Sequence, residues 1–89
     1  MTFEQFAANV QAWSEARGIY ERSSKHAQAL KAVSEMGELA DAVIKNDRDA
    51  LQDAIGDVIV CLVNVAEMSG LDVSECCESA WHEIKDRIC

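Results

Sequence analysis

Apolar residues recur at spacings of three and four along almost the whole chain, a pattern typical of amphipathic helices. The chain contains no proline, and short interruptions of the pattern occur at Gly18, Asn46-Asp47 and Gly70. These interruptions predict four helices: one ending at Gly18, one reaching about Lys45, one from Asp47 to Gly70, and one beyond it. Because the connections are short, we expect an all-α fold, a four-helix antiparallel bundle.

Residues that favour helix starts stand at the predicted boundaries. Ser23-Ser24 offers an N-cap for the second helix, and Asn46-Asp47 offers a turn and an N-cap for the third. Asp72, with Glu75 three residues later, resembles a capping box that opens the last helix. The apolar side of that helix is predicted to hold Cys76, Ala80, Ile84 and Ile88. Residues 18–24 form the most loop-like stretch of the chain.

The length of the chain limits the number of domains it can form. Eighty-nine residues with 49% hydrophobic content can build one core but not two, so residues 1–89 are predicted to form a single domain. A core of this size is thin, and domains this small usually gain stability from disulfides, metals or oligomerisation. We therefore expect at least a homodimer.

The charge excludes several partners. Sixteen acidic residues against eight basic ones give a net charge of −8, which repels the phosphates of nucleic acids. The longest apolar run, Val58 to Val63, is too short to span a bilayer, and Met1-Thr2-Phe3-Glu4 lacks the basic residues of a signal peptide. We expect a cytoplasmic protein with no nucleic-acid partner and no membrane partner.

Two carboxylates share one face of the second predicted helix. Glu35 and Glu38 lie three residues apart, so both point to the same side. By itself this spacing also fits a solvated helix surface, where paired acids are common. The ExxE motif therefore needs support from elsewhere in the chain.

That support comes from the third predicted helix. The run from Ala54 to Ala66 is apolar except for Asp57 and Asn64. Asp57 lies beyond the first helical turn, so neither capping nor the helix dipole explains it. Burying an unpaired charge is costly, and we therefore expect a cationic group to meet Asp57.

The polar residues of the third helix form a stripe. At 100° per residue, Asp53, Asp57 and Asn64 fall within about 40° of one another. An antiparallel second helix would place Glu35 and Glu38 opposite them. Lysines of the second helix could neutralise part of this charge, but a hard divalent cation such as Mg²⁺ prefers oxygen ligands and also accepts water and phosphate.

With these motifs, the stretch from Trp13 to Arg87 resembles MazG-like nucleoside triphosphate pyrophosphohydrolases, and most closely the short single-domain type found in phages and bacteria. The segments that carry the resemblance are Glu35-x-x-Glu38-Leu39-Ala40, Asp53-Ala54-Ile55-Gly56-Asp57-Val58, Gly70-Leu71-Asp72 and Glu83-Ile84-Lys85-Asp86-Arg87. The resemblance implies an all-α enzyme, dimeric or tetrameric, that uses Mg²⁺, with Mn²⁺ as a substitute. Such an enzyme converts a nucleoside triphosphate to the monophosphate and pyrophosphate and serves nucleotide-pool house-cleaning.

The resemblance also implies site residues. Glu35, Glu38 and Asp57 would be catalytic and would hold one or two Mg²⁺ ions, and either Glu35 or Glu38 would accept a proton from the attacking water. The family commonly has Glu three residues before the aspartate, whereas this chain has Ala54. Asp53 stays on the same face and is the alternative metal ligand, although a solvated first-turn acid explains it equally well.

Five further residues are candidates for substrate binding, and each has a structural alternative. Lys31 could reach a phosphate or pair with Glu35 one turn later. Near the end of the last helix, Lys85 and Arg87 resemble the family's basic residues and could bind the triphosphate, or complement the helix dipole. Asn64 could read the base or sugar or satisfy a buried polar network, and Trp13 could stack on a base or pack in the core.

Two other functions remain open. The alanine at position 54 is compatible with a degenerate, non-catalytic module that binds nucleotides. The net charge is compatible with an acidic interaction module that imitates the DNA backbone. A DNA mimic should spread its carboxylates over exposed faces, so an aspartate within an apolar run favours a metal site instead.

Overall fold

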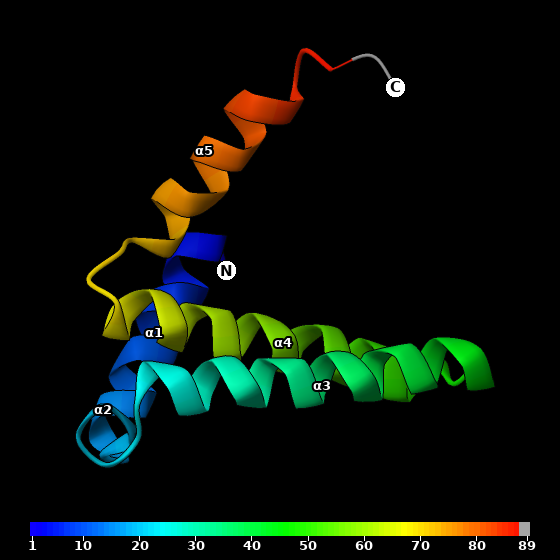
Figure 1. The fold of residues 1–89 in the computed structure, drawn as a ribbon, viewed down its shortest axis with the longest axis horizontal. Helices are drawn as coiled ribbons and strands as arrows, with labels where there is room; N and C mark the ends of the chain where they lie inside the picture. The colour runs from blue at the N-terminus through cyan, green and yellow to red at the C-terminus, as the bar shows by residue number, and fades with distance from the viewer. Residues whose placement is uncertain (88–89) are drawn as a thin grey trace.

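The computed structural model describes residues 1–87, and in this part the chain forms five helices and no strand (Figure 1). The helices are α1 (Phe3–Ala16), α2 (Ile19–Arg22), α3 (Lys25–Lys45), α4 (Arg48–Met68) and α5 (Val73–Ile84). The prediction of an all-α fold is confirmed. The predicted count of four was one too low, because the loop-like stretch contains the single turn α2. Ile88, predicted for the last helix, lies outside the described residues.

The predicted helix starts are confirmed by their capping geometry. The side chain of Ser24 accepts a hydrogen bond from a backbone N–H in the first turn of α3, and Asp47 and Asp72 do the same for α4 and α5. Gly18 precedes α2 with a φ of 72°, a left-handed conformation that glycine adopts without steric cost. This conformation lets the chain turn sharply out of α1 and makes room for α2.

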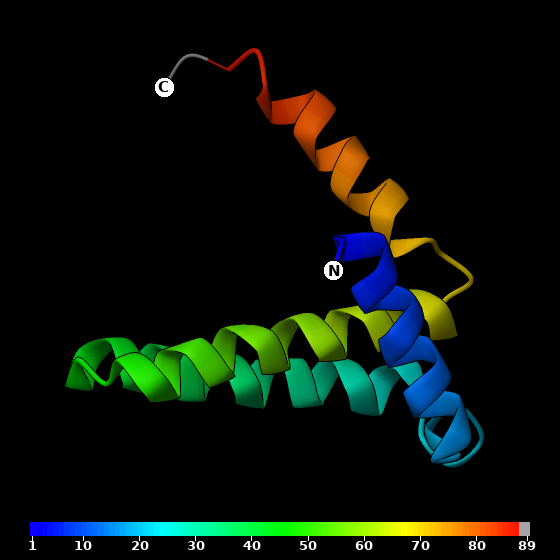
Figure 2. The same ribbon diagram turned by 180° about the vertical axis from the view of Figure 1, so that it is seen from behind.

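Helices α3 and α4 form an antiparallel hairpin that lies side by side over its full length in both views (Figures 1 and 2). Four small side chains are buried along this hairpin: Ala32, Ala42, Ala54 and Cys61. Small residues at a helix contact allow the two axes to approach closely. The hairpin therefore brings the remaining side chains of its two helices near one another.

The apolar core lies where α1 crosses the C-terminal half of α4, beside the start of α5. Its buried members are Ala7, Val10, Val63, Ala66 and Val73, with Phe6, Ile59 and Val60 packed against them. These side chains come from three helices that are far apart in sequence. The core is as small as the chain length predicts.

Helix α5 does not complete a bundle. It makes an angle of 106° with α4 and extends away from the hairpin (Figures 1 and 2). Only Val73 of this helix is buried, while Trp81 and Ile84 remain largely exposed. The radius of gyration is 14.4 Å, whereas a compact domain of this length would have about 12 Å. The four-helix antiparallel bundle is thus not formed by one chain, because the turn before Val73 directs α5 outward.

Exposed apolar side chains also cover the outer side of α3. Leu30, Val33 and Ile44 are mostly exposed and lie within about 60° of one another around the helix. Ala32 and Ala42, which face α4, lie on roughly the opposite side. A helix that is apolar on two sides is usually buried on both.

No single helix within residues 1–87 is long and apolar enough to cross a membrane. Helices α4 and α5 together would meet the requirements of length and composition, despite the bend between them.

The burial of Val63 predicts how much stability is lost when its side chain is shortened. Val63 is fully buried, so Val63→Ala should lower the free energy of unfolding by about 2 kcal/mol, because the lost methyl groups leave a cavity. Urea unfolding followed by circular dichroism measures this change. Leu71→Ala, in the exposed connection before α5, is the control and should cost less than about 0.5 kcal/mol. Equal costs for the two variants would contradict this description of the core.

Candidate active site

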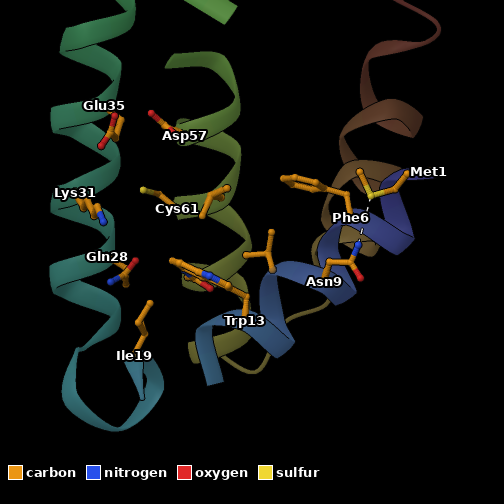
Figure 3. Close-up of a pocket in the computed structure, with 13 residues that line it drawn as sticks. Met1, Phe6, Asn9, Trp13, Ile19, Gln28, Lys31, Glu35, Asp57 and Cys61 are labelled. Atoms are coloured by element: carbon orange, nitrogen blue, oxygen red, sulfur yellow. Dashed lines mark hydrogen bonds between the residues drawn. The ribbon is translucent and has the colours of Figure 1, made fainter. Parts of the chain in front are cut away.

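A cavity of about 620 Å³ opens between α1, the start of α2, α3 and α4 (Figure 3). Its two ends differ in chemistry. Glu35 and Asp57 stand at one end, Trp13, Ile19 and Gln28 stand at the other, and the side chain of Lys31 lies between them (Figure 3). The volume falls in the range of pockets that hold small molecules.

At the acidic end, Glu35 on α3 and Asp57 on α4 point toward one another (Figure 3). The prediction that Asp57 is buried was wrong, because its side chain is exposed. Helix α3 covers the side of α4 that carries Ala54 and Cys61, and α1 covers the side that carries Val63. Asp57 falls between these two covered sides, at the mouth of the cavity.

A second hollow, of about 330 Å³, adjoins the acidic end and is lined by Glu38, Asp53 and Asp57. Asp57 therefore lines both hollows. Within the second hollow, Asp41 is paired with Lys45 at 2.9 Å. The four carboxylates that the sequence singled out thus border one strip between α3 and α4, as the antiparallel arrangement predicts.

Within residues 1–87, no three His, Cys, Asp or Glu side chains stand close enough together to hold a metal ion by themselves. The chemistry of the acidic end nevertheless suits a cation. Glu35 Oε2 is buried and has no hydrogen-bond donor among the described residues, and such an oxygen is costly to leave unpartnered. Mg²⁺ commonly takes one or two carboxylates and completes its shell with water and substrate phosphate. The carboxylates fit this mode of binding rather than a closed protein cage.

The charge around Glu35 is unbalanced. The pKa of Glu35 is raised, first by a side-chain hydrogen bond with Glu38, then by loss of solvent, and then by the negative charges of Glu38 and Asp57. Lys31 acts in the opposite direction. The raised pKa means that the ionised form of Glu35 lacks sufficient positive charge nearby.

Lys31 does not form the ion pair that was its structural alternative. Within residues 1–87, the ion pairs are Lys45 with Asp41 and Arg87 with Glu83, at 2.9 and 3.2 Å. The side chain of Lys31 is exposed and borders the cavity. Its ammonium is thereby left available beside the carboxylates.

Asn64 is both buried and next to the cavity. It is 2% exposed, and its Oδ1 accepts hydrogen bonds from Ser14 Oγ and Tyr20 Oη, each 2.8 Å long. Burial raises the pKa of Tyr20, so its hydroxyl remains a donor. The buried polar network predicted as the alternative for Asn64 is confirmed, and the same residue also lines the cavity.

Trp13 borders the cavity from α1 and is 48% exposed. The guanidinium of Arg17 lies 4.7 Å from the centre of its ring, so one face of the indole is occupied by a cation–π contact. The opposite face remains for a ligand.

Lys85 and Arg87 stand apart from this site. They follow the last turn of α5, and neither lines the cavity; Arg87 bonds to Glu83 instead. One chain does not bring these residues to the carboxylates, and their role in phosphate binding stays a prediction.

The sequence analysis did not single out Gln28 or Ser14. Gln28 is buried on α3, and its polar side chain at an inward position, seven residues before Glu35, was the available signal. The hydrogen bonds from Ser14 and Tyr20 to Asn64 gave no local signal, because 50 and 44 residues separate the partners in sequence.

Comparison with known proteins gives two matches. Residues 23–88 match the MazG nucleotide pyrophosphohydrolase domain. A stretch of 69 residues is 36% identical to an "Uncharacterized 18.2 kDa protein in rep-hol intergenic region" of Haemophilus phage HP1 (strain HP1c1). This match covers 78% of the chain and 42% of the phage protein, so the chain spans less than half the length of that relative. No solved structure matches the chain.

The domain match extends over α3, α4 and α5 and contains all four carboxylates of the acidic end. It also includes Lys31 and Asn64. The resemblance inferred from the two carboxylate motifs is therefore confirmed, and the chain belongs to the MazG nucleotide pyrophosphohydrolase family.

Proposed function

We propose that this protein is a Mg²⁺-dependent nucleoside triphosphate pyrophosphohydrolase that releases the monophosphate and pyrophosphate. The observation that carries the proposal is the meeting of Glu35 and Asp57 at one end of a cavity, with the buried Glu35 Oε2 lacking a donor. Family membership supports the same reaction class. Mn²⁺ is expected to replace Mg²⁺, because both accept oxygen ligands.

Each polar group at the acidic end has a role in this reaction. Glu35, Glu38 and Asp57 would hold the cation, with Asp53 as an auxiliary ligand in the second hollow. Bound Mg²⁺ supplies positive charge that stabilises the phosphate oxygens in the transition state. Either Glu35 or Glu38 would accept a proton from the attacking water.

Lys31 would bind the phosphates. It lies one helical turn, about 5 Å, before Glu35 on α3, and no carboxylate pairs with it among residues 1–87. Its charge can therefore contact a phosphate oxygen while the carboxylates hold the metal.

A homodimer or homotetramer is the proposed assembly. Leu30, Val33 and Ile44 on α3 and Trp81 and Ile84 on α5 are exposed in one chain, and apolar side chains gathered on one side of a helix, as on α3, mark an interface. A second copy could also supply Lys85 and Arg87 to the site.

A degenerate nucleotide-binding module is the second candidate, and Ala54 favours it. Ala54 is buried and borders the second hollow, so that position contributes no carboxylate. The two candidates differ in turnover: the enzyme would hydrolyse the bound nucleotide, whereas the degenerate module would only bind it.

The enzyme hypothesis predicts metal-dependent release of pyrophosphate. A panel of ribo- and deoxynucleoside triphosphates is incubated with Mg²⁺ or with EDTA, and monophosphate and pyrophosphate are measured. Asp57→Asn should lower kcat by at least about a hundredfold, because it removes negative charge that holds the cation. The control is Asp49→Asn, an exposed acid in the first turn of α4, which should keep wild-type activity.

Retention of full activity in Asp57→Asn would exclude the proposed role of that residue. If wild-type protein takes up Mg²⁺ and nucleotide but releases no pyrophosphate, the degenerate module is the correct interpretation.

The repulsion at Glu35 predicts opposite effects on stability and activity. Since the folded-state pKa is raised, the folded protein binds more protons than the unfolded chain, and the contribution of Glu35 to stability falls as pH rises through this range. In metal-free protein at neutral pH, Glu35→Gln should raise Tm, because it removes one of the repelling charges, and it should abolish both activity and the stabilisation by Mg²⁺. Thermal unfolding with and without Mg²⁺ tests this, with Glu78→Gln on exposed α5 as the control. A lower Tm in Glu35→Gln would contradict it.

The exposed face of α3 predicts self-association. Light scattering after size exclusion should give the mass of two or four chains, and Val33→Asp should shift the protein toward one chain, because it places a charge within an apolar interface. Lys25→Asp, at the exposed start of α3, should keep the assembly. A single-chain mass for the wild-type protein would refute the proposed oligomer.

A further inference from the structure

Two buried amide side chains border the end of the cavity that lies away from the carboxylates. Gln28 is 8% exposed and Asn64 is 2% exposed, and they come from α3 and α4. Gln28 precedes Glu35 by seven residues, or about 10 Å along the helix. Its side chain extends toward Trp13, on the opposite side of Lys31 from Glu35 (Figure 3).

Each amide is held by one end. Asn64 Oδ1 accepts two hydrogen bonds, from Ser14 and Tyr20. Gln28 Nε2 donates to Ser23 Oγ at 3.1 Å. The side-chain oxygen of Asn64 and the side-chain nitrogen of Gln28 are therefore already hydrogen-bonded within the protein.

The other end of each amide lacks a hydrogen-bond partner among the described residues, namely the NH₂ group of Asn64 and Oε1 of Gln28. The cavity therefore contains a fixed donor and a fixed acceptor. Among the described residues, the fully buried side-chain polar atom without a partner is Glu35 Oε2, so the free ends of Asn64 and Gln28 are not sealed in the interior. Because both residues line the cavity, these two atoms are open to it and can bond to a ligand there. They indicate a ligand that carries both a donor and an acceptor.

The residues around the two amides further restrict the class of ligand that fits. Trp13 and Ile19 line this end of the cavity (Figure 3), and neither amide is charged. A metal ion would lack carboxylate ligands here, because Glu35 and Asp57 lie at the other end of the cavity (Figure 3). A flat heteroaromatic ring fits, since it can stack on the indole face that Arg17 leaves open and place its edge at the amides.

We propose that Gln28 and Asn64 read the hydrogen-bonding edge of the substrate's nucleobase, with Gln28 accepting from the base and Asn64 donating to it. Ser23, Ser14 and Tyr20 are positioning residues that fix the two amides. This inference rests on the proposed function, and it places base selection at the end of the cavity that lies away from the metal site. A site that forms hydrogen bonds with a base discriminates strongly against bases without the matching donor or acceptor. A hydrophobic pocket that selects by size alone discriminates much less.

The test compares kcat/KM over a panel of nucleoside triphosphates that differ only in the base. In Gln28→Leu, kcat/KM for the best substrate should fall at least tenfold, mainly through KM, and the ratio between best and worst substrates should shrink. Gln28→Glu keeps an acceptor toward the base, and the hydroxyl of Ser23 can donate to the second carboxylate oxygen in place of the lost Nε2–H donation. This variant should therefore keep the order of preference among the bases. Lys31→Met, at the phosphate end, should lower kcat/KM by a similar factor for every base.

Equal losses for all bases in Gln28→Leu, which leave the ratio of kcat/KM between the best and the worst substrate unchanged, would show that Gln28 is only structural and would overturn the proposal. Tyr20→Phe provides a second variant if Gln28→Leu fails to fold. It removes one of the two hydroxyl groups that donate to Asn64 Oδ1, and it should also reduce the ratio of kcat/KM between the best and the worst substrate.

A second measurement distinguishes failure of the proposed enzyme activity from failure of the proposed base site. If wild-type protein cleaves no triphosphate, calorimetric binding of nucleoside monophosphates replaces turnover. Preference for one base in the wild type, lost in Gln28→Leu, then supports the base site without the enzyme. Binding that is absent or indifferent to the base overturns it.

Discussion

The close antiparallel packing of α3 against α4 is the constraint on which the rest of the structure depends. It is possible because the residues buried between the helices are small: Ala32, Ala42, Ala54 and Cys61. At this contact Glu35 and Asp57 face each other, and Gln28 and Asn64 line the same cavity. One helix pair thereby positions both ends of the proposed substrate site, while α1 closes the cavity with Trp13.

The same hairpin concentrates negative charge that the chain does not neutralise. Lys45 pairs with Asp41, but Lys31 remains separate from Glu35. The raised pKa of Glu35 and its buried oxygen without a donor both result from this excess of negative charge. Repulsion between carboxylates is common at cation-binding sites, because the ligands are arranged before the ion binds. A fold that relieved this repulsion internally would have less affinity for a metal and its phosphates.

A single chain leaves much apolar surface exposed, and this explains why the bundle predicted from the periodicity is not found within it. The periodicity specifies which sides of α3 and α5 are apolar, but it does not specify what covers them. Helix α5 turns away from α4 by 106°, so Trp81 and Ile84 lie outside the core, and Lys85 and Arg87 lie away from the carboxylates. A second copy is the proposed cover for these surfaces.

The sequence by itself determined the all-α class, the starts of α3, α4 and α5, and the four carboxylates between α3 and α4, because periodicity, capping and antiparallel connection act over short distances. Only the tertiary structure decided that Asp57 is exposed, that α2 exists, that α5 points outward, and that Ser14 and Tyr20 hold Asn64. The exposure of Asp57 and the contacts of Asn64 depend on packing between segments up to 50 residues apart, and local patterns carry no information about such contacts. The single turn α2 and the direction of α5 depend on the backbone geometry of short connections, which the hydrophobic periodicity does not specify.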